Sequence, residues 1–137
     1  RESWRLKSTL KFGRNTKVQF QANQSETNNE DNRFYGYGMS VKLHHSRNGH
    51  KVLLHWAGFI VDDYDARIYV WDVNLPGEMR SQMFYGTGQS VGLFVKIGTP
   101  FGADVSFRVR STWEFSRYTG EWSLPEVKSG FQMDIAF

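Results

Sequence analysis

Strict alternation of apolar and polar residues is the feature that most constrains the fold of this chain. In the stretch ADVSFRVRSTWEF, the odd-numbered positions from Val105 to Val109 are apolar, and the positions between them carry serine or arginine. Successive side chains of a β-strand point to opposite faces of its sheet, so a period of two predicts a strand with one apolar and one polar face. The alternation recurs and predicts seven strands: 4–13, 17–24, 34–45, 51–61, 88–98, 102–115 and 128–137.

The composition agrees with an all-β chain and argues against several other classes of protein. Aromatic residues make up 16% of the 137 residues, and 13 glycines accompany only 3 prolines, a balance typical of strands joined by turns. The length suits a single unit over 1–137. The chain has no cysteine, which excludes a disulfide framework or a thiol nucleophile within it. Its net charge of +3 is too small to indicate a nucleic-acid surface by itself.

Strand length and the placement of aromatic residues separate two architectures with such strands. A soluble barrel buries the apolar parity, whereas a membrane barrel exposes it to lipid and keeps the polar parity in its lumen. The predicted strands exceed the five or six residues usual in soluble sheets and match the roughly nine to eleven that cross a bilayer. We therefore predict an antiparallel transmembrane β-barrel. The expected lipid-facing residues include Val105, Phe107, Val109, Phe131, Met133 and Ile135. Interface aromatics are expected at one end as Trp4, Tyr35, Tyr37, Trp113 and Phe115, and at the other as Phe12, Phe101 and Phe137.

Short and long connections alternate between the predicted strands. The polar stretches 24–33 and 116–128 are long, as the outer loops of bacterial barrels are. The same rule makes 62–87 one large outer segment, in which RIYVWDV (67–73) is expected to form a hairpin above the membrane or inside the lumen. The tight turns are GRNT (13–16), SRNG (46–49) and GTPFG (98–102).

The odd number of strands predicts that this chain is the C-terminal part of a larger barrel. Bacterial single-chain barrels usually have an even number of strands with both ends in the periplasm, so at least one strand is expected before Trp4. An upstream part of the same protein, or another chain, would then complete the barrel. An alternative count takes 67–73 as an eighth span and closes a small barrel, although it breaks the alternation of turns.

Two stretches carry a resemblance to known proteins. The ending SGFQMDIAF resembles the assembly signal of outer-membrane barrels, with Gly130, Phe131 and Phe137 in the signal positions. The region of about 50–98 resembles the barrel of Bacteroidetes outer-membrane proteins that carry helix-hairpin-helix repeats nearer their N-terminus. The resemblance implies a location in the outer membrane of a Gram-negative bacterium, with the lipid bilayer and the barrel-insertion machinery as partners. The residues that carry it are Asp62, Tyr64, Arg67, Ile68, Tyr69, Tyr85, Gly86 and Gly88.

Candidate catalytic and metal-binding residues do not form a recognisable pattern. His44 and His45 are adjacent in a predicted strand and therefore point to opposite faces, which argues against a shared metal with His50. His55 has no nucleophile elbow or fixed spacing to a serine, as a hydrolase triad would need. The acidic group Asp62, Asp63 and Asp65 lacks the periodic ligands of a calcium loop. We therefore predict no enzyme activity, metal or cofactor, although an outer-membrane enzyme stays a third hypothesis.

Basic residues dominate the polar parity of the predicted strands. One interpretation is an electropositive lumen that attracts anions, with nucleic acid among them. The other is that these residues pair with Asp104, Glu114, Asp134 and the rest of the barrel. The expected function is a membrane anchor, conduit or scaffold of porin-like type, and the alternative is a soluble β-barrel that binds a small apolar ligand. The basic residues are Arg5, Lys7, Lys11, Lys17, Lys42, Lys51, Lys96, Arg108 and Arg110.

Overall fold

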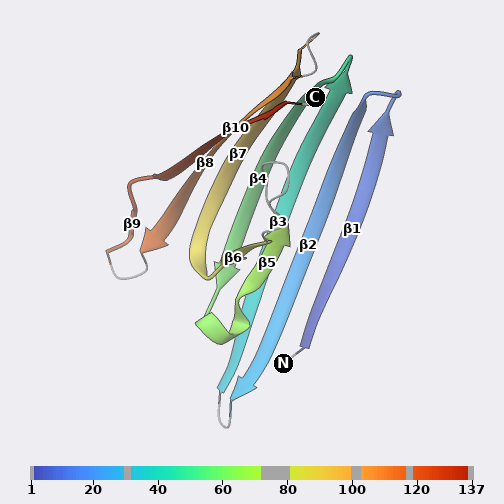
Figure 1. Cartoon of the computed structure of the whole chain (residues 1–137). Helices are drawn as coiled ribbons and strands as arrows, with labels where there is room; N and C mark the ends of the chain where they lie inside the picture. The colour runs from blue at the N-terminus through green and yellow to red at the C-terminus, as the bar shows by residue number, and fades with distance from the viewer. Residues whose placement is uncertain (1, 30–31, 72–80, 100–102, 117–118, 136–137) are drawn as a thin grey trace.

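The chain forms one large antiparallel β-sheet that carries a small hairpin on one face (Figure 1). The computed structural model describes residues 2–29, 32–71, 81–99, 103–116 and 119–135. Neighbouring strands of the sheet follow one another in the sequence, except that the hairpin lies between β4 and β7. The strands are, in spatial order, β1 (Glu2–Phe12), β2 (Thr16–Asn29), β3 (Asn32–Arg47), β4 (His50–Val61), β7 (Gly86–Gly98), β8 (Ala103–Ser116) and β10 (Glu126–Ile135), with the short β9 (Glu121–Trp122) paired to β8.

The all-β, antiparallel prediction is confirmed, but the sheet of eight strands is open and no closed barrel is found among the described residues. The eighth strand is β9, so the alternative that counts 67–73 as an eighth span is wrong. Residues of that stretch form β5 (Ile68–Trp71), which pairs with β6 (Ser81–Phe84) in a separate two-stranded sheet. β10 pairs with β8, as expected, and its described residues do not pair with β1.

The prediction of a long loop over 24–33 is wrong, because most of this stretch is strand. The pairing of β2 with β3 continues outward until Asn29 lies opposite Asn32. Side-chain alternation does not indicate this extension, because both faces are polar here, with Glu26 and Thr27 next to each other in the chain. Ladder hydrogen bonds join backbone groups and need no apolar face, so a hairpin extends into water without any alternation of side chains.

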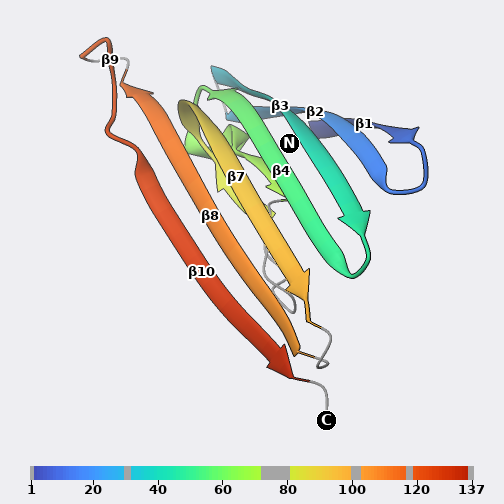
Figure 2. The ribbon, with the colours of Figure 1, turned by 90° about the horizontal axis from the view of Figure 1, so that it is seen from above.

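The sheet curls around the hairpin, which consists of the 3₁₀ turn η1 (Tyr64–Ala66), β5 and β6 (Figure 2). Arg5 of β1 donates a hydrogen bond to the Tyr69 carbonyl at 3.3 Å, and Arg110 of β8 donates one to Gln82 Oε1 at 3.3 Å. In a flat sheet, five strand spacings would hold β1 and β8 about 24 Å apart, too far for both to contact one narrow hairpin. The hairpin therefore lies on the concave face.

The buried core lies between the hairpin and the concave face, at the end of the sheet where β1 begins. The Phe59 and Phe84 rings stack across this interface with centroids 4.3 Å apart. No helix among the described residues is long and apolar enough to cross a membrane. The buried residues of the core are Ala57, Phe59, Val61, Ala66, Ile68, Val70 and Phe84, with Phe34 packed against them.

The short turns at the opposite end of the sheet are staggered. Pairing in the first hairpin stops at Phe12 and Thr16, which belong to the same cross-strand row as His45, Val52 and Val95. Pairing continues past that row in the second hairpin and further still in the third, which closes only at Gly98 opposite Asp104. A progressive stagger of this kind accompanies strands that are tilted as in the wall of a barrel.

Candidate functional site

The convex face of the sheet is apolar and exposed. Leu6 and Phe131 are each 66% exposed, and Ile60 is 53% exposed, although all three are large hydrophobic residues within long strands. An apolar hollow of about 490 Å³ lies on this face among Trp4, Tyr37, Trp56 and Trp122, and the Trp56 ring covers Gly58. The structure places the residues predicted to face lipid on this convex face: Val105, Phe107, Val109, Phe131, Met133 and Ile135.

Aromatic side chains gather on the convex face near the end where the hairpin lies. The register aligns Trp4, Tyr37 and Phe115 in one row across the sheet. Tyr35 stacks on Tyr37 with ring centroids 6.2 Å apart, and Phe115 contacts Trp122 edge to face at 5.5 Å. Trp113 lies one row further in. The aromatic residues predicted for one interface therefore lie close together in the structure.

The aromatics predicted for the other interface are only partly visible. Phe12 shares a convex row with Phe107 and Phe131. The predicted positions Phe101 and Phe137 lie outside the described residues. Gly130 lies opposite Arg108 on the concave parity of β10.

Small residues line the concave face beneath the hairpin. A Cβ on Gly36 would overlap the Ala66 carbonyl oxygen, and a Cβ on Gly38 would overlap the Ile68 Cδ1 atom. Ser40 and Ser90, one row further along, are also buried. The hairpin therefore packs directly on the backbone of β3. Glycine at every second position of a strand, as at Gly36 and Gly38, is a sequence sign that another backbone lies close.

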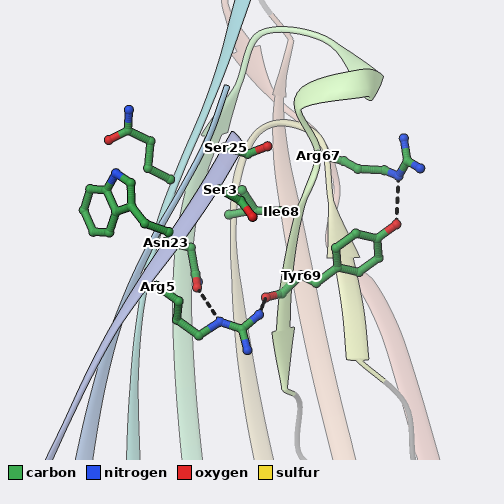
Figure 3. Close-up of a pocket in the computed structure, with 9 residues that line it drawn as sticks. Ser3, Arg5, Asn23, Ser25, Arg67, Ile68 and Tyr69 are labelled. Atoms are coloured by element: carbon green, nitrogen blue, oxygen red, sulfur yellow. Dashed lines mark hydrogen bonds between the residues drawn. The ribbon is translucent and has the colours of Figure 1, made fainter. Parts of the chain in front are cut away.

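A polar cavity of about 210 Å³ separates β1 and β2 from the hairpin (Figure 3). Arg5 spans it, because its Nε donates to Asn23 Oδ1 at 3.1 Å while its Nη2 donates to the Tyr69 carbonyl. Asn23 is buried, and its Nδ2 has no hydrogen-bond partner among the described residues. The Arg5 guanidinium group thus links β1 and β2 to the hairpin across this cavity.

The acidic residues of the outer segment hold its backbone in place. Asp62 Oδ2 accepts a hydrogen bond from the Tyr35 amide at 3.2 Å, and Asp63 Oδ1 caps η1 by accepting from the Asp65 amide at 3.1 Å. Arg67 lies 4.5 Å from the centre of the Tyr64 ring and donates to the Tyr69 hydroxyl at 2.8 Å, and this hydrogen bond raises the pKa of Arg67. These contacts give the aspartates a structural role.

Basic residues occupy the concave face beyond the hairpin. We call this group the basic belt. Its members lie on strands from β1 to β10 and in adjacent rows, so the curled sheet brings together residues far apart in the sequence. The sequence analysis missed Lys128, although it has the same parity as Gln132 and Asp134. The belt comprises Lys11, Lys17, Lys42, Lys51, Lys96, Arg108, Arg110 and Lys128.

Acidic partners are unevenly distributed along the basic belt. Lys96 pairs with Asp104, and Lys128 pairs with Glu126 at 2.9 Å. In contrast, Lys11 lies directly opposite Lys17, and neither has an ion pair with a described carboxylate. Of the acidic residues expected to pair with basic ones, Asp104 forms an ion pair with Lys96. The pair of Lys128 with Glu126 was not among those predicted.

The histidines do not form a metal site. His44 lies on the concave face beside Lys17, whereas His45 lies on the other face, where its Nδ1 is 2.9 Å from Thr16 Oγ1. His55 is buried on the concave parity of β4. No group of three metal-ligating side chains occurs within the described ranges.

Comparison with protein-family models, with curated proteins and with solved structures finds no match to this chain.

Proposed function

We propose that this chain is part of the wall of an outer-membrane β-barrel, which serves as a membrane anchor and as a conduit with a basic interior. The observation that carries the proposal is the placement of the two parities. The exposed apolar parity lies on the outside of the curl, while the polar parity faces the hairpin on the inside. A lipid-exposed barrel needs this arrangement, and a soluble barrel around an apolar ligand needs the reverse.

The size of the exposed apolar face supports a covering by lipid. Soluble monomers rarely expose contiguous apolar patches larger than a few hundred Å². Here large hydrophobic side chains are exposed on every long strand, from Leu6 on β1 to Met133 on β10. The strands have 10 to 16 residues, enough to cross a hydrocarbon core when tilted. The apolar hollow beside Trp56 is open to the outside, where an acyl chain would fill it.

The open edges of the sheet support completion of the barrel by further strands. An unpaired strand edge within a bilayer costs several kcal/mol for each exposed backbone group. β1 and β10 cannot satisfy one another in the antiparallel manner of the other strands, because six successive antiparallel pairings leave them pointing the same way. We propose that another part of the protein or another chain supplies the missing strands, in agreement with the resemblance to larger Bacteroidetes barrels.

Fluorescence quenching by brominated lipid tests the location. Trp56 lies on the convex face near the middle of β4, so vesicles with chains brominated near the bilayer centre should quench its emission. Trp56→Phe should remove most of the quenched component, and the control Trp122→Phe, near the end of the sheet, should not. A protein that stays monomeric without detergent and shows no quenching would refute the membrane location.

A further inference from the structure

Two adjoining cavities at the end of the concave face opposite the hairpin have strongly basic linings. The larger has a volume of about 530 Å³ and contains Lys11, Arg14, Lys17 and Lys51 in its lining. The smaller has a volume of about 180 Å³, and Lys7 and Lys42 contribute to it. His44 lines both cavities and so marks where they meet. Six cationic side chains from four strands and one turn therefore surround one recess.

Lys11 and Lys17, which line the larger cavity, have no ion pair with a described carboxylate. No described carboxylate lines either cavity. Lys11 and Lys17 are direct cross-strand partners on the same face, an arrangement that destabilises a sheet because like charges lie about 5 Å apart at Cβ. The nearest described ion pair of the basic belt, Lys96 with Asp104, lies beyond Lys51. An anion in the recess would relieve this repulsion.

We infer that the recess binds a multivalent phosphate-type anion. A single carboxylate would neutralise only one of six cations, whereas linked phosphate groups present several charges and many acceptor oxygens to lysine ammonium groups. The larger cavity, with a volume of about 530 Å³, has room for several linked phosphate groups. This inference deepens the proposed function, on which it rests for a basic interior, by naming what that interior binds.

The lining also argues against recognition of single-stranded nucleic acid through its bases. Proteins that bind such strands usually stack the bases on aromatic side chains. No phenylalanine, tyrosine or tryptophan is among the described residues that line the two cavities. The chemistry offered is charge and hydrogen bonding from lysine, arginine, glutamine and serine, which suits phosphate groups without bases.

Titration calorimetry of the purified protein in detergent with inorganic tripolyphosphate tests the inference. Lys17→Gln and Lys51→Gln should each weaken binding about fivefold to tenfold, because each removes a charge-assisted contact. The matched control is Lys128→Gln, which makes the same charge change on the same face but outside the recess, and binding should change less than about twofold. Equal loss in all three variants would mean diffuse attraction and would overturn the site, as would no binding to the unmodified protein.

Thermal unfolding supplies a second measurement that a misfolded variant cannot imitate. Lys17→Gln relieves repulsion with Lys11, so its Tm without ligand should rise, while the increase in Tm on adding tripolyphosphate should shrink. A Tm increase as large as that of the unmodified protein would contradict a site at Lys17. Acetate at equal ionic strength should not displace tripolyphosphate, and effective competition by acetate would overturn the choice of a multivalent anion.

The outcome is separable from that of the proposed membrane location. Quenching by brominated lipid reports on the convex face, and the titration reports on the concave face. If the protein binds tripolyphosphate but stays monomeric without detergent and its tryptophan emission is not quenched, the anion site is supported and the membrane location is refuted. If the protein inserts into vesicles but does not bind tripolyphosphate, the membrane location is supported and the anion site is refuted.

Discussion

At the scale of single residues, Gly36 and Gly38 determine where the hairpin lies. Glycine in a strand interior is normally unfavourable by roughly 0.5–1 kcal/mol relative to alanine, because it loses more conformational freedom on folding. Both positions have no free space above the backbone, since η1 and Ile68 occupy it. The intrinsic preference for a larger residue is therefore overridden by close packing between the hairpin and β3.

A double-mutant cycle between Gly38 and Ile68 should measure this packing. Gly38→Ala should lower the free energy of unfolding by about 1–3 kcal/mol through overpacking, despite the better strand propensity of alanine. Ile68→Val, which removes the conflicting Cδ1 atom, should lower it by about 0.5–1.5 kcal/mol. The double variant should lose less than the sum of the two, as read from urea unfolding. Additive losses would show that the two residues do not contact one another.

At the scale of elements, the β5–β6 hairpin is firmly packed against the concave face of the sheet. Its apolar side chains form the buried core together with Phe59 and Val61, and Arg5 and Arg110 hold it from opposite sides. The hairpin is therefore built into the fold at one end, and the recess at the other end stays open. At the hairpin end of the sheet, the last paired residues of β2, from Thr27 to Asn29, are polar on both faces, as expected of a segment in water.

Removing the hairpin should expose the small residues beneath it. Val61 and Gly86 are register partners, so a two-residue Asn-Gly turn can join β4 to β7 in place of 62–85. Because the chain lacks cysteine, Ser90→Cys gives a single thiol beneath the hairpin, and its reaction with a maleimide should become several-fold faster in the deletion variant. Ser106→Cys, buried three concave rows further along the sheet than Ser90, should react slowly in both proteins. Faster reaction at Ser106→Cys would show instead that the sheet had opened.

At the scale of the whole molecule, the two faces of the sheet predict opposite responses to a charge. Leu54 is exposed on the convex face, so Leu54→Arg should be nearly neutral if water covers that face. In a bilayer the same substitution should lower the free energy of unfolding by roughly 2–4 kcal/mol. The control Gln132→Arg adds the same charge on the concave face of β10, beside Asp134 and outside the recess, and should be mild. Measurement by urea unfolding in phospholipid vesicles distinguishes the two, and equal effects would contradict the assignment of faces.

The sequence predicted the seven long strands because their side-chain alternation has a simple physical cause. Residues such as Phe107 and Arg108 must face opposite sides of any sheet, whatever covers those sides. The alternation did not reveal the hairpin contacts, because these depend on glycines, which have no side chain. It did not reveal the extension to Asn29 either, because that extension depends on backbone pairing alone. The recess was also hidden, because Lys7, Lys17 and Lys51 come together only after the four strands β1 to β4 have paired in register.

Because β4 and β7 are neighbours in the sheet, the sheet and the hairpin between them can evolve separately. The hairpin segment leaves the sheet after Val61 and returns at Gly86, the residue directly opposite, so its length does not alter the pairing of any other strand. Lengthening a flexible loop costs only about 0.6 kcal/mol for each doubling. Insertions between these two residues can therefore accumulate over generations and reshape the interior while the surrounding strands keep their register. In a lineage carrying this fold, the lining of the concave face can therefore change at this connection without loss of strand pairing.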